Sequence, residues 1–457
     1  MTSPTVSVKR VSECFVKPQH DHSQDAKQPI YLTPFDLPFL NLNYSQKGLL
    51  FAKPPPSENQ HFSITTFLNN LRNSLSATLT HFYPLAARLA TRKQQNPPSY
   101  VIYIDPENSP GVKFIHATVD VSVSDILTST YVPSVVHSFF DLNGAICHDG
   151  HTLPLLSIQV TELTDGIFIG GSVNHVLADG TSFWLFMSSW SQIFKSNVNE
   201  NACFVSRTPI FKRWVLEQHD PITSLPFSYP DEFIERYERP QHLKERFFHF
   251  TTASVSKLKT KANTECNTEK ISSLQAVSAL LWRCVTRARH QPLNSETICK
   301  LVVSNRGRAN PPMSEDYFGN PIGSVSATTT VEELMAHGLG CAALRIHEAV
   351  RSHDDKAVKT QVARWYRNPV VYKMSGLLPP NITHIGSSPR FDMYGCEFGL
   401  GKAVAARSGM MNKGDGKVTM YPGREGGGSM DVEVCLLPEY MMDLECDEEF
   451  ISALIEE

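Results

Sequence analysis

Two apolar runs joined by an Asp-Gly pair constrain the fold of this chain more than any other feature. Residues 155–163 and 167–175 each have the length and composition of a buried strand, with Thr164, Asp165 and Gly166 between them. Because glycine tolerates the positive φ of a tight turn, this pattern predicts a β-hairpin. From residue 183 to 194 the apolar residues follow a helical spacing instead. The peptide 175–180 is therefore predicted to be a strand-to-helix turn, where functional side chains are often presented.

The rest of the chain mixes helices and strands without strict alternation, which favours α/β domains with mixed sheets over a Rossmann core. Its 457 residues exceed what one hydrophobic core usually holds. Residues 206–245 are rich in proline and weakly patterned, so we expect a linker there. This linker would separate an N-terminal domain over 1–205 from a C-terminal domain over 246–457. Within the second domain, residues 331–353 predict one long helix.

Charge and cysteine usage exclude several classes of protein. The formal net charge is -4 and basic residues are scattered, so neither nucleic acid nor a membrane is expected as a partner. The ten cysteines form no CxxC pair and no zinc-finger spacing, so no metal is expected. The chain begins without a basic segment followed by an apolar one, and its apolar stretches are too short to span a bilayer. We therefore expect a soluble, cytoplasmic protein.

An HxxxD spacing occurs three times, at His116, His137 and His175, so the spacing alone identifies nothing. A histidine taken alone is more often a hydrogen-bonded structural residue than a catalytic one. Only His175 ends a long buried strand, and only Asp179 is followed at once by a glycine and a helix. A neutral imidazole can take a proton from an alcohol or amine near neutral pH and later return it. The context therefore favours His175 as a general base.

Several segments, taken together, match the landmarks of one protein family in order and spacing. Residues 174–184, Asn-His-Val-Leu-Ala-Asp-Gly-Thr-Ser-Phe-Trp, resemble its HxxxDG motif. Residues 82–89 resemble its FYPLAGRL segment, with Ala87 in place of glycine. Further landmarks follow in the same order as in the family: Trp-Arg-Cys at 282–284, Tyr-Phe-Gly-Asn at 317–320, and Glu-Phe-Gly-Leu-Gly at 397–401 where the family has DFGWG. Together these segments resemble the plant BAHD acyl-CoA-dependent acyltransferases, and the resemblance covers nearly the whole chain.

The resemblance implies two domains like chloramphenicol acetyltransferase, with an active-site tunnel between them. It implies that His175 is the general base, that Gly180 belongs to the same turn, and that Asp179 binds Arg306 in a structural role. The acyl group would pass directly from acyl-CoA, a cosubstrate, to a small-molecule acceptor. No acyl-enzyme, metal or bound cofactor would be needed, and the enzyme would act as a monomer.

Contacts to the two substrates are also implied. The C-terminal domain would be the main CoA-binding side, with Ser272 and Ser273 at a helix N-terminus and Lys259 just upstream as candidate ligands. The same serines and lysine equally fit a plain helix cap and a solvated surface. Arg390 stands where some members of the family bind an acceptor carboxylate, and a structural arginine would look the same in the sequence.

Two departures and several alternatives remain. Glu397 and Leu400 replace the aspartate and tryptophan of DFGWG, which bears on packing more than on chemistry. The resemblance favours transfer to a hydroxyl of a plant specialised metabolite. The alternatives are N-acylation of an amine, a changed reaction such as elimination, and a non-catalytic metabolite-binding protein.

Overall fold

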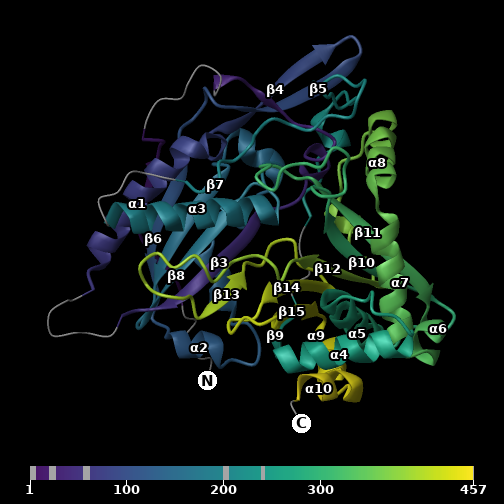
Figure 1. Cartoon of the computed structure of the whole chain (residues 1–457). Helices are drawn as coiled ribbons and strands as arrows, with labels where there is room; N and C mark the ends of the chain where they lie inside the picture. The colour runs from purple at the N-terminus through teal and green to yellow at the C-terminus, as the bar shows by residue number, and fades with distance from the viewer. Residues whose placement is uncertain (1–6, 20–26, 55–61, 199–204, 238–241, 456–457) are drawn as a thin grey trace.

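The computed structural model describes residues 7–19, 27–54, 62–198, 205–237 and 242–455. It has a mixed α/β fold in which two six-stranded sheets dominate two sheet-rich domains (Figure 1). Among the described residues, no helix is long and apolar enough to cross a membrane. The mixed-sheet class predicted from the sequence is confirmed, whereas the tunnel and the domain boundaries at 205 and 246 stay predictions.

The first sheet is built around the predicted hairpin. Its strands lie in the order β1 (Lys9–Val16), β6 (Val112–Thr118), β7 (Leu156–Glu162), β8 (Gly166–Val173), β3 (Ser45–Ala52) and β13 (Ala405–Ser408). β7 and β8 pair antiparallel, which confirms the hairpin. The prediction that Gly166 is needed for a positive φ is wrong, because Gly166 is not among the glycines with positive φ. A Cβ there would instead lie 2.4 Å from Val123 and 2.8 Å from the Phe51 carbonyl oxygen, so packing requires the glycine.

Helices α1 (Ile64–His81) and α3 (Gly180–Val198) pack on each other beside the first sheet (Figure 1). Ser63 caps α1 as predicted, by accepting a hydrogen bond from the Thr66 amide. The buried Trp190 of α3 donates its indole N–H to Ser74 of α1 over 3.0 Å. Shorter elements complete this half: α2 (Val123–Leu127) and a three-stranded sheet of β2 (Ile30–Tyr31), β5 (Pro98–Asp105) and β4 (Arg88–Gln95).

The second sheet has the strand order β11 (Ile322–Thr330), β10 (Glu296–Ser304), β12 (Ile382–Ser387), β14 (Lys417–Pro422), β15 (Met430–Leu436) and β9 (Lys244–Phe250). Its apolar face packs against a group of helices: α4 (Thr252–Glu265), α5 (Ser273–Ala288), α7 (Leu339–Ser352), α9 (Pro438–Glu445) and α10 (Glu448–Leu454). α8 (Asp355–Arg367) extends beyond the end of α7. The two halves interlock, because β13 follows β12 in the chain yet pairs with β3 of the first sheet.

The single long helix predicted over 331–353 is wrong. The chain forms α6 (Val331–Ala336) and α7, which are separated at His337 and Gly338. A Cβ on Gly338 would lie 2.4 Å from a carboxylate oxygen of Glu265, so the turn is fitted closely against α4. Apolar periodicity continues across the break, which is why the sequence pattern does not reveal it.

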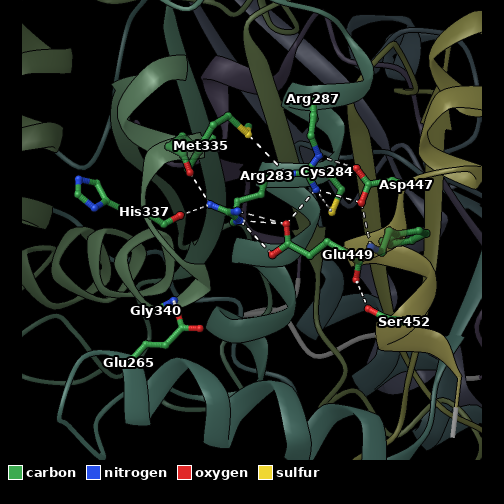
Figure 2. Close-up of polar contacts among 12 residues, drawn as sticks. Glu265, Arg283, Cys284, Arg287, Met335, His337, Gly340, Asp447, Glu449 and Ser452 are labelled. Carbon is green, nitrogen blue, oxygen red and sulfur yellow. Dashed lines mark hydrogen bonds and ion pairs between the residues drawn. The ribbon is translucent and has the colours of Figure 1, made fainter. Parts of the chain in front are cut away.

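A charged cluster ties the C-terminal helix to the core of the second half (Figure 2). Arg283 of α5 donates to both carboxylate oxygens of Glu449, at 3.1 and 3.2 Å, and to the carbonyl oxygens of Leu334 and His337. Arg287, one turn later, binds Asp447 and Glu449. Burial alone would raise the pKa of Glu449, but the two arginines outweigh it and hold that pKa below its ordinary value.

Replacement of Arg283 should therefore destabilise the second half. Arg283→Met removes the ion pair and leaves two backbone carbonyls without their donor, so we expect a loss of about 2 kcal/mol or more in the free energy of unfolding. Urea unfolding followed by circular dichroism measures the change. Arg351→Met, at an exposed arginine of α7, is the matched control and should change stability by less than about 0.5 kcal/mol. Equal losses in the two variants would contradict the structural role of the cluster.

Candidate active site

The turn after β8 is fixed by the residue that precedes His175. Asn174 is fully buried, and its amide nitrogen donates to the Cys147 carbonyl oxygen over 2.8 Å. Its amide oxygen accepts from the Val176 N–H, and the His175 N–H points to the Cys147 sulfur at 3.1 Å. These bonds satisfy the backbone where β8 ends. His175 therefore projects from a rigid turn, as the sequence predicts.

The His175 ring is held by residues from distant parts of the chain. Its Nδ1 lies 3.2 Å from the side-chain oxygen of Asn320, whose amide nitrogen donates to the His175 carbonyl oxygen. Because that nitrogen is the amide donor, the Asn320 oxygen faces Nδ1 as the acceptor. Phe39 stacks on the ring, with centroids 5.0 Å apart and planes inclined by 9°. Nδ1 therefore carries the proton, and the lone pair of Nε2 remains available.

The environment keeps this ring neutral. Burial lowers the pKa of His175 below its ordinary value, while the Asp179 charge and the Asn320 hydrogen bond oppose this effect without reversing it. The side chain nevertheless keeps intermediate exposure. A neutral imidazole with an accessible Nε2 can accept a proton from a bound molecule.

Asp179 does not contact the His175 ring but forms a buried ion pair with Arg306. The two guanidinium nitrogens reach the two carboxylate oxygens at 2.6 and 3.0 Å, and both side chains are 1 % exposed. Arg306 also donates to Ser182 and to the Tyr317 carbonyl oxygen. Asp179 further caps α3 by accepting from the Ser182 N–H. The pair therefore joins the start of α3 to two segments of the second half, which agrees with a structural role.

A second buried pair holds the segment that carries Asn320. Arg213 donates to the Phe318 carbonyl oxygen over 2.5 Å, and its Nε lies 3.3 Å from a carboxylate oxygen of Asp36. Burial raises the pKa of Asp36, and the Arg213 charge opposes that rise. No pattern in the sequence pointed to Arg213, Asp36 or Phe39, because none of them lies in a long helix or strand with a recognisable period. Asn320 stands in the Tyr-Phe-Gly-Asn landmark, which could have identified it.

Gly180 begins α3 and is required by close packing. A Cβ at this position would lie 2.9 Å from two carbons of the Phe391 ring. Phe391 follows Arg390 in the loop after β12, so this loop lies against the start of α3. The Arg390 side chain itself is exposed, and its backbone N–H bonds to the Ser388 hydroxyl.

The residues predicted to bind CoA lie elsewhere on the second half. Ser272 is the N-cap of α5, accepts from the Gln275 N–H, and forms a capping box with that residue. Ser273 is the first residue of α5, and Lys259 is exposed on α4. In the described part of the chain, none of these three side chains contacts His175. Their role in binding stays a prediction.

The divergent Glu397–Gly401 motif packs against the C-terminal half of α3. Glu397 pairs with Lys195 at 2.5 Å, and the Phe398 ring lies 4.7 Å from the Trp190 ring. Leu400 is a partly buried member of the same apolar core. The two departures at 397 and 400 therefore lie at a packing contact and not beside His175.

The chain is similar to known proteins over almost its full length. The model of a family described as the transferase family matches residues 6–451. An Arabidopsis thaliana protein described as an uncharacterized acetyltransferase is 39% identical over 97% of this chain and 98% of its own length. BAHD acyltransferase DCR, also from Arabidopsis thaliana, is 32% identical over 98% of this chain and 93% of its own length.

Two solved structures share the fold. Vinorine synthase aligns with a TM-score of 0.76 at 18% identity, over 98% of both chains. TRI101 of F. sporotrichioides, solved with coenzyme A and T-2, aligns with a TM-score of 0.69 at 18% identity. That alignment covers 93% of this chain and 98% of TRI101. At these identities the likeness shows the fold alone.

The buried Arg306–Asp179 pair generates a stability prediction. Arg306→Met leaves an uncompensated carboxylate in the interior, so we expect a loss of about 3–5 kcal/mol in the free energy of unfolding. Arg207→Met breaks the exposed pair with Asp316 and should cost less than about 1 kcal/mol. Chemical denaturation of both variants measures the difference. Similar losses at the two positions would show that the buried pair is not the main connection.

Proposed function

Since the chain belongs to the transferase family of BAHD acyltransferases, we propose that His175 is the general base of its acyl transfer from acyl-CoA. The protein is an acyltransferase, and we propose a hydroxyl of a plant specialised metabolite as its acceptor. One observation carries the proposal: Asn320 orients the His175 ring through Nδ1, burial keeps the ring neutral, and no described residue hydrogen-bonds to Nε2.

In the proposed step, the acceptor oxygen attacks the carbonyl carbon of the thioester while Nε2 of His175 takes the hydroxyl proton. A carbon–oxygen bond forms and gives a tetrahedral intermediate. The carbon–sulfur bond then breaks, and the proton passes from His175 to the leaving thiolate. The products are the acyl ester and free CoA, so no covalent enzyme intermediate is required.

Other residues would support this step without taking part in it. Asp179 is proposed as a scaffold and not as a proton relay, because both of its oxygens bind Arg306 and neither bonds to the ring. Asn320 is proposed as the positioning residue that selects the tautomer with the proton on Nδ1. Ser272, Ser273 and Lys259 are proposed for the CoA phosphates, where a helix N-terminus and an ammonium group favour negative charge.

Loss of the base should abolish most of the activity. We expect His175→Ala to lower kcat by about 10²–10⁴-fold in an assay that detects thiol release from a panel of acyl-CoA donors and acceptors. His116→Ala is the matched control, because His116 belongs to another HxxxD spacing, lies on β6, and is 3.6 Å from Glu162 of β7. Undiminished thiol release in His175→Ala would overturn the assignment. Acyl-CoA binding without turnover across the panel would favour the binding-protein alternative.

The pH dependence tests the state of the same ring. The pKa of His175 lies below its ordinary value of 6.5. As the pH rises, the ring therefore loses its proton before pH 6.5 is reached, and it is neutral at all higher pH values. With a neutral acceptor and acetyl-CoA, kcat/KM should be constant from about pH 7 to 8 and should fall only as the pH drops below about 6.5. A falling limb centred above pH 7 would contradict a neutral, buried base.

A further inference from the structure

Three basic side chains stand in a row on one face of the second sheet. Lys300 on β10 is paired with His384 on β12, and His384 is paired with Lys417 on β14. Paired residues of neighbouring strands point to the same face of a sheet. The residues next to them in sequence, Leu301 and Ile385 among them, belong to the core formed with the helices. The basic row (Lys300, His384, Lys417) therefore lies on the face away from the helices.

This face is turned toward the first sheet and His175. On the same strand as Lys417, the Tyr421 hydroxyl accepts a hydrogen bond of 2.9 Å from Lys47 of β3. The charge of Lys417 also contributes to the lowered pKa of both His175 and Lys47. The basic row and the proposed base therefore face the same space between the sheets.

The side chains of the basic row are partly exposed, and the sheet leaves room for them. All three side chains keep intermediate exposure. A Cβ on Gly386 would lie 2.8 Å from Nζ of Lys417, so the missing side chain leaves room for the ammonium group above β12. No hydrogen bond or ion pair links the three side chains to any residue that the structure describes. Their polar atoms are therefore free to bind a ligand.

The nearby carboxylates do not neutralise the row, because they are already engaged. Lys413 lies 2.7 Å from both Glu245 and Glu433. Glu433 also accepts from the hydroxyls of Ser408 and Tyr421, at 2.6 and 2.9 Å. His137 adds a further contact to Glu245.

Positive charge in the row is therefore left without a full counter-charge. Burial and the neighbouring charge of Lys300 lower the pKa of Lys417 to about 8, although Glu433 opposes this. His384 has a pKa well below its ordinary value, first because of burial and then because of Lys417 and Lys300. Two lysines on either side of His384, in a poorly solvated space, favour the binding of an anion.

We propose that Lys300, His384 and Lys417 form a subsite for a carboxylate of the substrate, so that this acyltransferase selects an acidic partner. The inference rests on the proposed function, because it places the carboxylate in the space that His175 serves. The two ammonium groups would bind the carboxylate oxygens, and neutral His384 would donate one ring N–H. The exposed Arg390 is not needed for this recognition. The carboxylate comes either from the acceptor or from the far end of the acyl group.

The double variant Lys300→Met, Lys417→Met tests the subsite in two arms. In the acceptor arm, acetyl-CoA is combined with hydroxy acids and with their primary amides. In the acyl arm, a neutral alcohol is combined with succinyl-CoA and with butyryl-CoA, which carries a methyl group in place of the carboxylate. In one arm we expect kcat/KM for the carboxylate substrate to fall by at least about 10-fold, while its neutral analogue changes by less than about 3-fold. The arm that responds identifies the source of the carboxylate.

Three comparisons make the result decisive. Lys356→Met, at an exposed lysine of α8, is the matched control and should leave both arms unchanged. The variant Lys300→Arg, Lys417→Arg keeps the charge and should restore part of the preference. Circular dichroism confirms folding, and single Lys→Gln variants replace the double variant if it does not fold. Equal losses for acids and neutral analogues, or weaker binding of acetyl-CoA itself, would overturn the subsite.

A binding measurement separates this proposal from the proposed base. Isothermal titration calorimetry measures the affinity of each protein for the carboxylate substrate of the arm that responds. We expect His175→Ala to bind it as tightly as the unsubstituted protein, and the double methionine variant to lose this affinity. If His175→Ala keeps full turnover while the double variant loses its preference for acids, the general base is wrong and the subsite stands. If the carboxylate substrate binds the unsubstituted protein and the double methionine variant equally well, the subsite is wrong. This conclusion holds whether or not His175 is the general base.

Discussion

The ion pair between Asp179 and Arg306 is the connection on which the active site depends. It is buried and bidentate, and Ser182 and the Tyr317 carbonyl oxygen accept further hydrogen bonds from Arg306, so each charge has its counter-charge. A buried pair of this kind is costly to form and more costly to break on one side. The pair therefore contributes more to the relative position of the segments that it joins than to the net stability of the protein. What it positions is the start of α3 against the segment before β11, and His175 lies between these two.

The position of His175, the proposed base, is consequently set by both halves of the chain. β8 and the buried Asn174 set the backbone of His175, whereas Asn320 from the other half sets the ring. Phe39 stacks on one face of the His175 ring. A shift between the halves would separate Asn320 from the ring without breaking any bond within the first sheet. On the second sheet, Glu245 and Glu433 are bound by Lys413, so they offer the basic row only part of a counter-charge.

Local sequence patterns predicted many helices, strands and turns, whereas the features that depend on contacts between distant segments could not be predicted. The hairpin, the capped start of α1 and the turn at His175 follow from period, caps and turn residues within short windows. The reason for Gly166 and the break at Gly338 did not follow, because each depends on an atom of a distant segment. Asp36 and Arg213 are ordinary loop residues until the fold brings them together. The basic row was equally hidden, since single lysines on three strands become neighbours only through sheet register.

The return of β13 to the first sheet has a consequence for synthesis on the ribosome. β3 pairs with β8 on one side, but its other side stays an open edge until residues 405–408 leave the exit tunnel. An open edge offers unpaired backbone groups to any other nascent strand. The first half thus emerges incomplete for most of translation, although proteins usually fold from the N-terminus onward. Truncated chains that end before residue 405 should therefore depend on chaperones, whereas the finished chain closes its own edge.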